Sequence, residues 1–140
     1  MQMKKLFLIM LLFTGSVVVA ETGKTGNNGN EKLVVLWTSD DPYVAERVAF
    51  MYTHAAKTAG WFENVTLIIW GPSARLAAEN LKIQEKLKAM QKDGIAIQAC
   101  VVCADAYQVS ETLRNLGFEV KPMGKPLTDY LKQDAKVLTF

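Results

Sequence analysis

Between residues 32 and 140, short apolar runs alternate with amphipathic stretches. Three runs, at 32–37, 65–70 and 95–100, are rich in β-branched residues and show no polar alternation. This pattern is typical of strands that are buried on both faces of a sheet. A shorter, more polar run at 118–121 and a final one at 136–140 predict two further strands.

The stretches between the runs predict helices. Asp41-Pro42 is a helix start, since an aspartate caps and proline fits the first turn. Gly60, Gly94 and Gly117 close the first three helices, and a short fourth covers 126–132. Apolar positions recur at helical spacing and are expected to face the sheet. They are Val44, Val48, Met51, Ala55, Leu76, Ile83, Leu87, Met90, Ala106, Val109, Leu113 and Leu116.

Strict strand–helix alternation predicts a three-layer α/β/α domain around a five-stranded parallel sheet. The commonest arrangement is flavodoxin-like, with strand order 2-1-3-4-5. In that order the first and third strands are neighbours, and a crevice opens beyond their carboxyl ends. We therefore expect the cysteines that follow the third strand to face Asp40, Asp41 and Tyr43 across a ligand crevice.

The first 20 residues have the layout of a secretory signal peptide. Lys4 and Lys5 precede a short apolar core at 6–13, and Ala20 offers a small residue for cleavage. Residues 21–31 contain no large apolar side chain and are expected to form a flexible spacer before a domain at 32–140. We expect a periplasmic or secreted protein without a membrane anchor after cleavage.

The composition of the chain excludes several classes of protein function. The chain has 140 residues, is 50% hydrophobic and carries a formal net charge of +2, which suits one globular domain. Basic and acidic residues are mixed, so no nucleic-acid footprint is present. No glycine-rich loop follows the first strand, and no cofactor is expected. His54 is the only histidine; we expect it to pack in the core, which makes a metal site improbable.

Cys100 and Cys103 are the only cysteines and form a Cys-x-x-Cys motif. They could be core cysteines, a disulfide or redox pair, or a carrier of persulfide sulfur. We expect Asp105 to cap the helix and Cys103 to precede it. Proximity to a helix start favours the thiolate, whereas carboxylates nearby disfavour it, and the sequence leaves that balance open.

Purely structural roles are also open for the remaining residues that could line the crevice. Asp40 and Asp41 could form an acid–base pair, but a solvated Asp40 and a capping Asp41 are favoured. Trp37 and Trp70 end two strands, where they could form an apolar rim for a ligand or protein, or simply pack. Tyr107 could line the crevice or an interface, or have neither role.

The chain resembles the DsrE/DsrF-like family from residue 32 to residue 140. The resemblance lies in segments 99–107, 113–120, 123–128 and 136–140. It implies a flavodoxin-like domain, assembly into trimers or hexamers and, for some members, sulfur relay through a cysteine at the end of the third strand. Cys100 fits that position, and Cys103 is the second cysteine of an exported subgroup with Cys-x-x-Cys-Ala. Gln108 stands where relatives are expected to have glycine, at a position that we expect to lie inside a helix.

The leading hypothesis is therefore an exported sulfur-relay protein. Cys100 would accept sulfur from a small sulfur species or a donor protein, and Cys103 would be its partner thiol. The alternatives are a Cys-x-x-Cys redox protein and a non-catalytic module that binds a small anion or mediates assembly. Whether the protein is an enzyme stays open.

Overall fold

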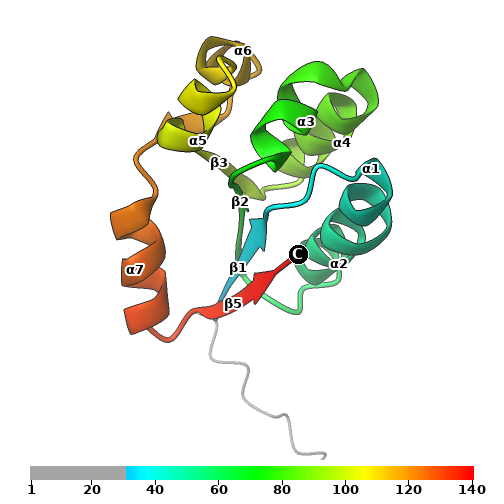
Figure 1. The fold of residues 1–140 in the computed structure, drawn as a ribbon. Coiled ribbons are helices and arrows are strands. Elements are labelled where there is room, and N and C mark those ends of the chain that lie inside the picture. Colours follow the sequence, from blue (N-terminus) through cyan, green and yellow to red (C-terminus); the bar gives the residue numbers. More distant parts are fainter. Residues whose placement is uncertain (1–30) are drawn as a thin grey trace, which may run out of the picture.

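The computed structural model describes residues 31–140 as a parallel five-stranded sheet between helices (Figure 1). All five expected strands form, and the α/β fold class is confirmed. The predicted signal peptide, and the spacer up to residue 30, lie outside the described residues. Within 31–140, no helix is both long and apolar enough to span a membrane. The strands are β1 (Lys32–Trp37), β2 (Asn64–Ile69), β3 (Ala96–Cys100), β4 (Glu119–Lys121) and β5 (Lys136–Thr139).

The strand order is β4-β3-β2-β1-β5. The predicted order 2-1-3-4-5 was wrong, because β2 lies between β1 and β3 and pairs with both in parallel. The chain adds β2, β3 and β4 successively on one side of β1 and then places β5 on the other side. Alternation of strands and helices is equally compatible with both orders, so the sequence pattern alone did not separate them.

Two of the expected helices are divided. Asn80 has an extended backbone and ends the first half of one, and its side-chain oxygen accepts from the Ile83 amide at 3.2 Å to begin the second half. Gln108 lies in the left-handed region, with φ 59°, and interrupts the other; the prediction that it lies inside a helix was wrong. The helices are α1 (Pro42–Val44), the π-helix η1 (Ala45–Ala49), α2 (Phe50–Thr58), α3 (Ser73–Glu79), α4 (Leu81–Lys92), α5 (Val101–Ala106), α6 (Ser110–Asn115) and α7 (Gly124–Lys132).

The first helical segment turns a different face to the sheet from the predicted one. Val48 and Met51 are 41% and 63% exposed, whereas Ala45, Ala49 and Phe50 are buried. Small alanines allow the helix to approach the sheet closely, and the π-helical turn shifts the face that follows it. The prediction that Val48 and Met51 face the core was therefore wrong.

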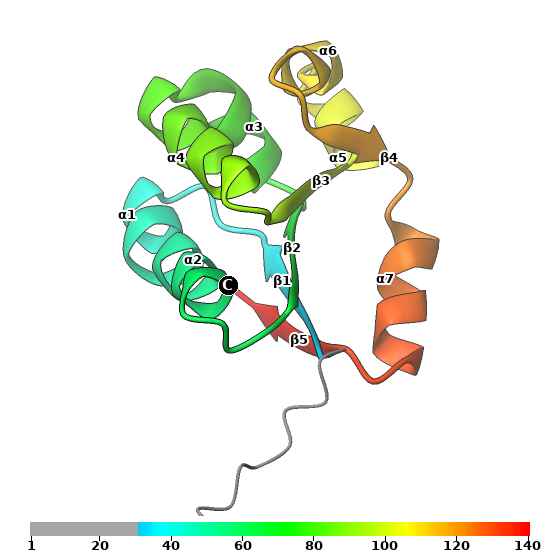
Figure 2. The ribbon, with the colours of Figure 1, turned by 180° about the vertical axis from the view of Figure 1, so that it is seen from behind.

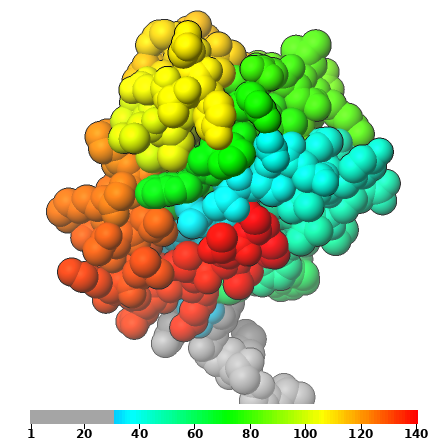
Figure 3. Space-filling view, viewed as in Figure 1, coloured from blue at the N-terminus to red at the C-terminus, as the bar shows by residue number. Residues whose placement is uncertain are grey.

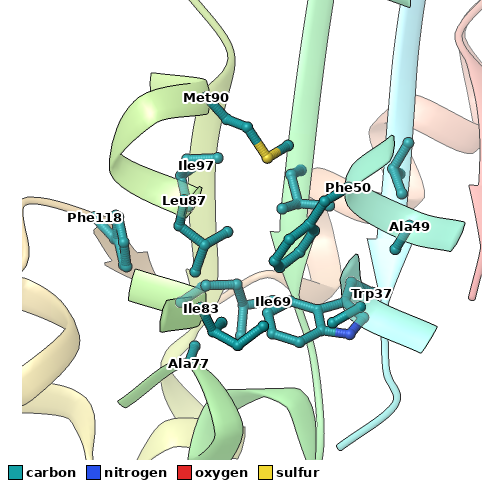
Figure 4. Close-up of a cluster of buried hydrophobic side chains, with 14 of the residues drawn as sticks. Trp37, Ala49, Phe50, Ile69, Ala77, Ile83, Leu87, Met90, Ile97 and Phe118 are labelled. Atoms are coloured by element: carbon teal, nitrogen blue, oxygen red, sulfur yellow. The ribbon is translucent and has the colours of Figure 1, made fainter. Parts of the chain in front are cut away.

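The larger core lies on the side of the sheet that α2, α4 and α6 cover (Figure 4). Trp37 is fully buried there, and its ring meets that of Phe50 edge-on. Ile83, Leu87 and Met90 pack in this core, as their spacing predicted. Trp37 therefore forms no exposed rim.

The opposite side of the sheet is covered more sparsely. There α7 lies apart from the other helices, as both ribbon views show (Figures 1 and 2). A small cluster of Val34, Ile68, Cys100 and Met123 is buried beneath it. The cysteine motif therefore belongs to the thinly covered side.

Candidate functional site

The Cys-x-x-Cys motif spans the junction between β3 and α5. Cys100 is the last residue of β3, and its extended backbone makes it the N-cap of α5. Cys103 is the third residue of α5 and so lies inside the helix. The prediction that Asp105 caps this helix was wrong: Asp105 also lies in α5, where it accepts a hydrogen bond from the Ser110 hydroxyl. The helix begins directly after the strand, with no intervening turn.

The two thiols lie next to one another in an apolar setting. Cys100 is 4% exposed, and Cys103 is half-buried. Cys103 packs against the buried cluster that contains Cys100, as do partly buried side chains from β1, β5, α7 and the segments that follow β2 and α7. These are Leu36, Trp70, Leu127, Tyr130, Ala135 and Val137. On the surface, α5 (yellow) adjoins the green segment after β2, with the orange segment of α7 nearby (Figure 3).

Burial raises the pKa of the Cys103 thiol above its ordinary value. A backbone N–H of Gly71 donates to the sulfur and opposes this shift, whereas the neighbouring Cys100 thiol adds to the raised pKa. The sequence left open whether a helix start or nearby carboxylates dominate. The protonated thiol of Cys103 is favoured, and desolvation rather than carboxylate charge is the largest cause.

The expected crevice does not form as predicted, because β2 separates the loops after β1 and β3. Asp40 pairs with Arg75 at 2.8 Å, and Arg75 in turn lies over the Tyr107 ring at 5.8 Å. Asp41 accepts from the amides of Tyr43 and Val44 and caps α1, as expected. The Tyr43 side chain is 75% exposed. Arg75, which no motif in the sequence indicated, links the Asp40 loop to the segment after the cysteines.

A polar network next to Cys100 was also missed. Gln98 Nε2 donates to Glu119 Oε2 at 2.7 Å, and Lys121 Nζ lies 2.6 Å from Glu119 Oε1. Cys100 and Lys121 are paired in the β3–β4 ladder. The sequence alone shows that residues two apart in a strand share one face of the sheet. It does not show that β3 and β4 are neighbours or in which register they pair, and the network depends on both.

The prediction that His54 packs in the core was wrong. Its Nε2 lies 2.7 Å from Asp93 Oδ2, and its side chain is 41% exposed. It borders a cleft of about 340 Å³ whose lining includes Phe50, Lys86 and Met90, on the opposite side of the sheet from the thiols. In residues 31–140, no group of three or more His, Cys, Asp and Glu side chains is placed to hold a metal ion.

Comparison with known proteins adds to this geometry. Residues 32–140 match the model of the DsrE/DsrF-like family. A conserved protein of unknown function from Bacteroides thetaiotaomicron, BT1422, is 36% identical, with a TM-score of 0.76 over 79% of this chain and 95% of that one. The ychN protein from E. coli is 16% identical, with a TM-score of 0.60 over 79% of this chain and 99% of that one. No curated protein matches the chain.

Proposed function

The chain belongs to the DsrE/DsrF-like family, and we propose that it is an exported thiol protein that handles sulfane sulfur. Cys100 accepts the sulfur and Cys103 is its partner thiol. The observation that carries this proposal is the contact between two free thiols at the carboxyl end of β3, one buried and one half-buried.

The chemistry needs no net oxidation. The Cys100 thiolate attacks the outer sulfur of a donor persulfide, the donor's S–S bond breaks, and the donor leaves as a thiolate. The transferred sulfur remains on Cys100 as a persulfide. Cys103 then attacks that outer sulfur, so that the persulfide moves to the more exposed of the two positions and Cys100 leaves as the thiolate. The apolar surroundings of the pair support a persulfide by limiting contact with water.

Intact mass spectrometry tests this proposal. The protein is reduced, exposed to glutathione persulfide and weighed before and after further reductant. We expect a gain of one sulfur atom that reductant removes, loss of this gain in Cys100→Ser, and retention of loading in Cys103→Ser with slower release to an acceptor thiol.

Other results would identify the alternatives. A reducible Cys100–Cys103 disulfide that takes up no sulfur would make the protein a redox protein. Free thiols that ignore both the donor and oxidants would favour a non-catalytic binding or assembly module. Either result would overturn the sulfur-handling proposal.

Export and assembly are parts of the same proposal. Expression of the full chain in a Gram-negative host should give a periplasmic protein that begins at Glu21. Light scattering on this product should give the mass of a trimer or hexamer, as the family resemblance implies. A product that keeps Met1 would contradict export, and a monomer would contradict assembly.

A further inference from the structure

Three polar side chains on β3 and β4 lie on the same face of the sheet as the buried thiol. Gln98 is paired with Glu119 in the β3–β4 ladder, and Cys100 is paired with Lys121. Side chains two residues apart share a face of a strand, and paired residues of parallel strands project to the same side. Lys121 is therefore the direct cross-strand neighbour of Cys100.

Hydrogen bonds connect the polar side chains of this network. Both carboxylate oxygens of Glu119 are engaged, one by Gln98 and one by Lys121. The ammonium of Lys121 lowers the pKa of Glu119, with a further contribution from Gln98, so the carboxylate stays ionised. In the ladder Glu119 is thus paired with Gln98 and Lys121 with Cys100, and the ammonium of Lys121 reaches the Glu119 carboxylate.

The cationic member of the network remains open to a ligand. The side chain of Lys121 is about one-third exposed and can be reached from solvent, and its ammonium is paired with Glu119. Gln98 Oε1 is buried without a hydrogen-bond partner, but this oxygen is an acceptor and takes no part in binding an anion.

The buried cluster that contains Cys100 is packed by aliphatic and aromatic side chains and by the second thiol. Lys121 is the charged residue that is paired with Cys100 in the β3–β4 ladder, and Glu119 is the partner of that lysine.

We propose that Lys121 binds the negative charge of the sulfur donor at Cys100, and that the donor is a small anion with a terminal sulfane sulfur, such as inorganic polysulfide. This inference rests on the proposed sulfur-handling function. The Cys100 thiolate bonds to the terminal sulfur of the polysulfide dianion, the adjacent S–S bond breaks, and a dianion shorter by one sulfur leaves. Cys100 is left as a persulfide anion, so that charge balances and no external oxidant is required. The positive charge of Lys121 offsets the negative charge of both anions.

A pair of alkylating agents tests the electrostatic part without any sulfur chemistry. Iodoacetate and iodoacetamide react with a thiol by the same displacement, but only the first is an anion. In a Cys103→Ser background, mass spectrometry gives the rate of Cys100 modification by each, and the ratio of the two rates measures the local charge.

We expect Lys121→Gln to lower the iodoacetate-to-iodoacetamide ratio about three- to tenfold, the effect of one nearby charge in partly aqueous surroundings. Lys121→Arg should retain the ratio, and Glu119→Gln should raise it. Lys125→Gln is the matched control, since Lys125 is an exposed lysine paired with Asp129 on α7, and it should leave the ratio unchanged. Damage to packing would change the reaction rates of both reagents together. It would not change their ratio in opposite directions in the Lys121 and Glu119 variants.

An unchanged ratio in Lys121→Gln would overturn the inference, as would changes of the same sign in the Lys121 and Glu119 variants. Failure of Cys100 to react with either reagent would also overturn it, because a thiol that small reagents cannot reach cannot take sulfur from a small anion. Loading with inorganic polysulfide then separates the two proposals. If the wild-type protein loads from polysulfide and Lys121→Gln loads equally fast, or if the wild type loads from glutathione persulfide but not from polysulfide, only the inference fails. If the wild type takes up sulfur from neither donor, the sulfur-handling function fails.

Discussion

The Trp37 and Phe50 rings meet edge to face, with centroids 4.8 Å apart and ring planes at 77°. This contact joins the carboxyl end of β1 to the start of α2, at the place where the π-helix ends. Both residues belong to the main core and are almost fully buried.

Loss of this contact should be costly. Phe50→Ala removes a buried ring and leaves a cavity against Trp37, so we expect the free energy of unfolding to fall by about 3–5 kcal/mol. Phe50→Leu fills most of the space and should cost about 1–2 kcal/mol. Urea denaturation followed by circular dichroism measures both. Equal losses in the two variants would contradict the cavity as the main cause and would assign the loss to the missing ring contact.

Gln108 should be replaceable with a gain in stability. A non-glycine residue at φ 59° is strained, whereas glycine adopts this conformation freely. We expect Gln108→Gly to stabilise the protein by about 0.5–1 kcal/mol in thermal or urea unfolding. Gln133→Gly is the control, since Gln133 is exposed and has φ −95°, and there glycine should give no gain. A loss of stability in Gln108→Gly would contradict the assignment of strain.

The two neighbouring aspartates should differ in their effects on stability. Asp41 Oδ1 accepts from the amides of Tyr43 and Val44 at 2.7 and 3.2 Å, so Asp41→Ala should cost about 1 kcal/mol. Asp41→Asn keeps an acceptor and should cost less. Asp40→Ala breaks only the half-exposed pair with Arg75 and should cost at most about 0.5 kcal/mol. Chemical denaturation of the three variants measures these losses of stability. A larger loss in Asp40→Ala than in Asp41→Ala would refute the capping role of Asp41.

Alkylation of Cys103 should be slow at neutral pH. Its pKa is raised by burial, so the reactive thiolate is scarcer than in a free cysteine, and the rate should keep rising above the pH at which a free cysteine levels off. Iodoacetamide labelling of Cys100→Ser across alkaline pH, with a cysteine peptide as the reference, measures this profile. A rate at neutral pH that exceeds that of the peptide would contradict the raised pKa.

The raised pKa of Cys103 also makes the free energy of unfolding depend on pH. The folded state holds the Cys103 proton more tightly than the unfolded chain does. Its contribution is therefore full below the pKa of an unfolded cysteine and is lost as pH rises through the raised folded pKa. Cys103→Ser should flatten the pH dependence of unfolding in that alkaline window only, and a steeper dependence in the variant would reverse the sign.

Local patterns in the sequence predicted elements better than their arrangement. The apolar runs located all five strands, and Asp41-Pro42 located the start of α1, because strand burial and capping depend on neighbouring residues. The inward face of the first helical segment was missed because alanines rather than larger residues pack against the sheet there. The break at Gln108 was missed because glutamine gives no sign of a left-handed backbone.

The candidate site was predictable only in part. The strand-end position of Cys100 followed from the apolar run before it, and the structure has it there. The neighbours of the thiols depend on strand order and register, which are long-range properties. This is why Gly71 and Lys121 were not foreseen, and why Asp40, Asp41 and Tyr43 were expected across a crevice that β2 in fact occupies.

The sparse cover on the thiol side of the sheet has a kinetic consequence. No residue of α7 is fully buried, and Leu131 on its outer side is 63% exposed, so the helix is held mainly by partly buried side chains such as Leu127 and Tyr130. Segments that bury little surface open locally at a lower free energy than the whole domain does. Detachment of α7 would uncover Cys100 while the core around Trp37 stays folded. The frequency of that opening, visible as early amide hydrogen exchange in 124–132, would then set an upper limit on how often bulky reactants meet the buried sulfur.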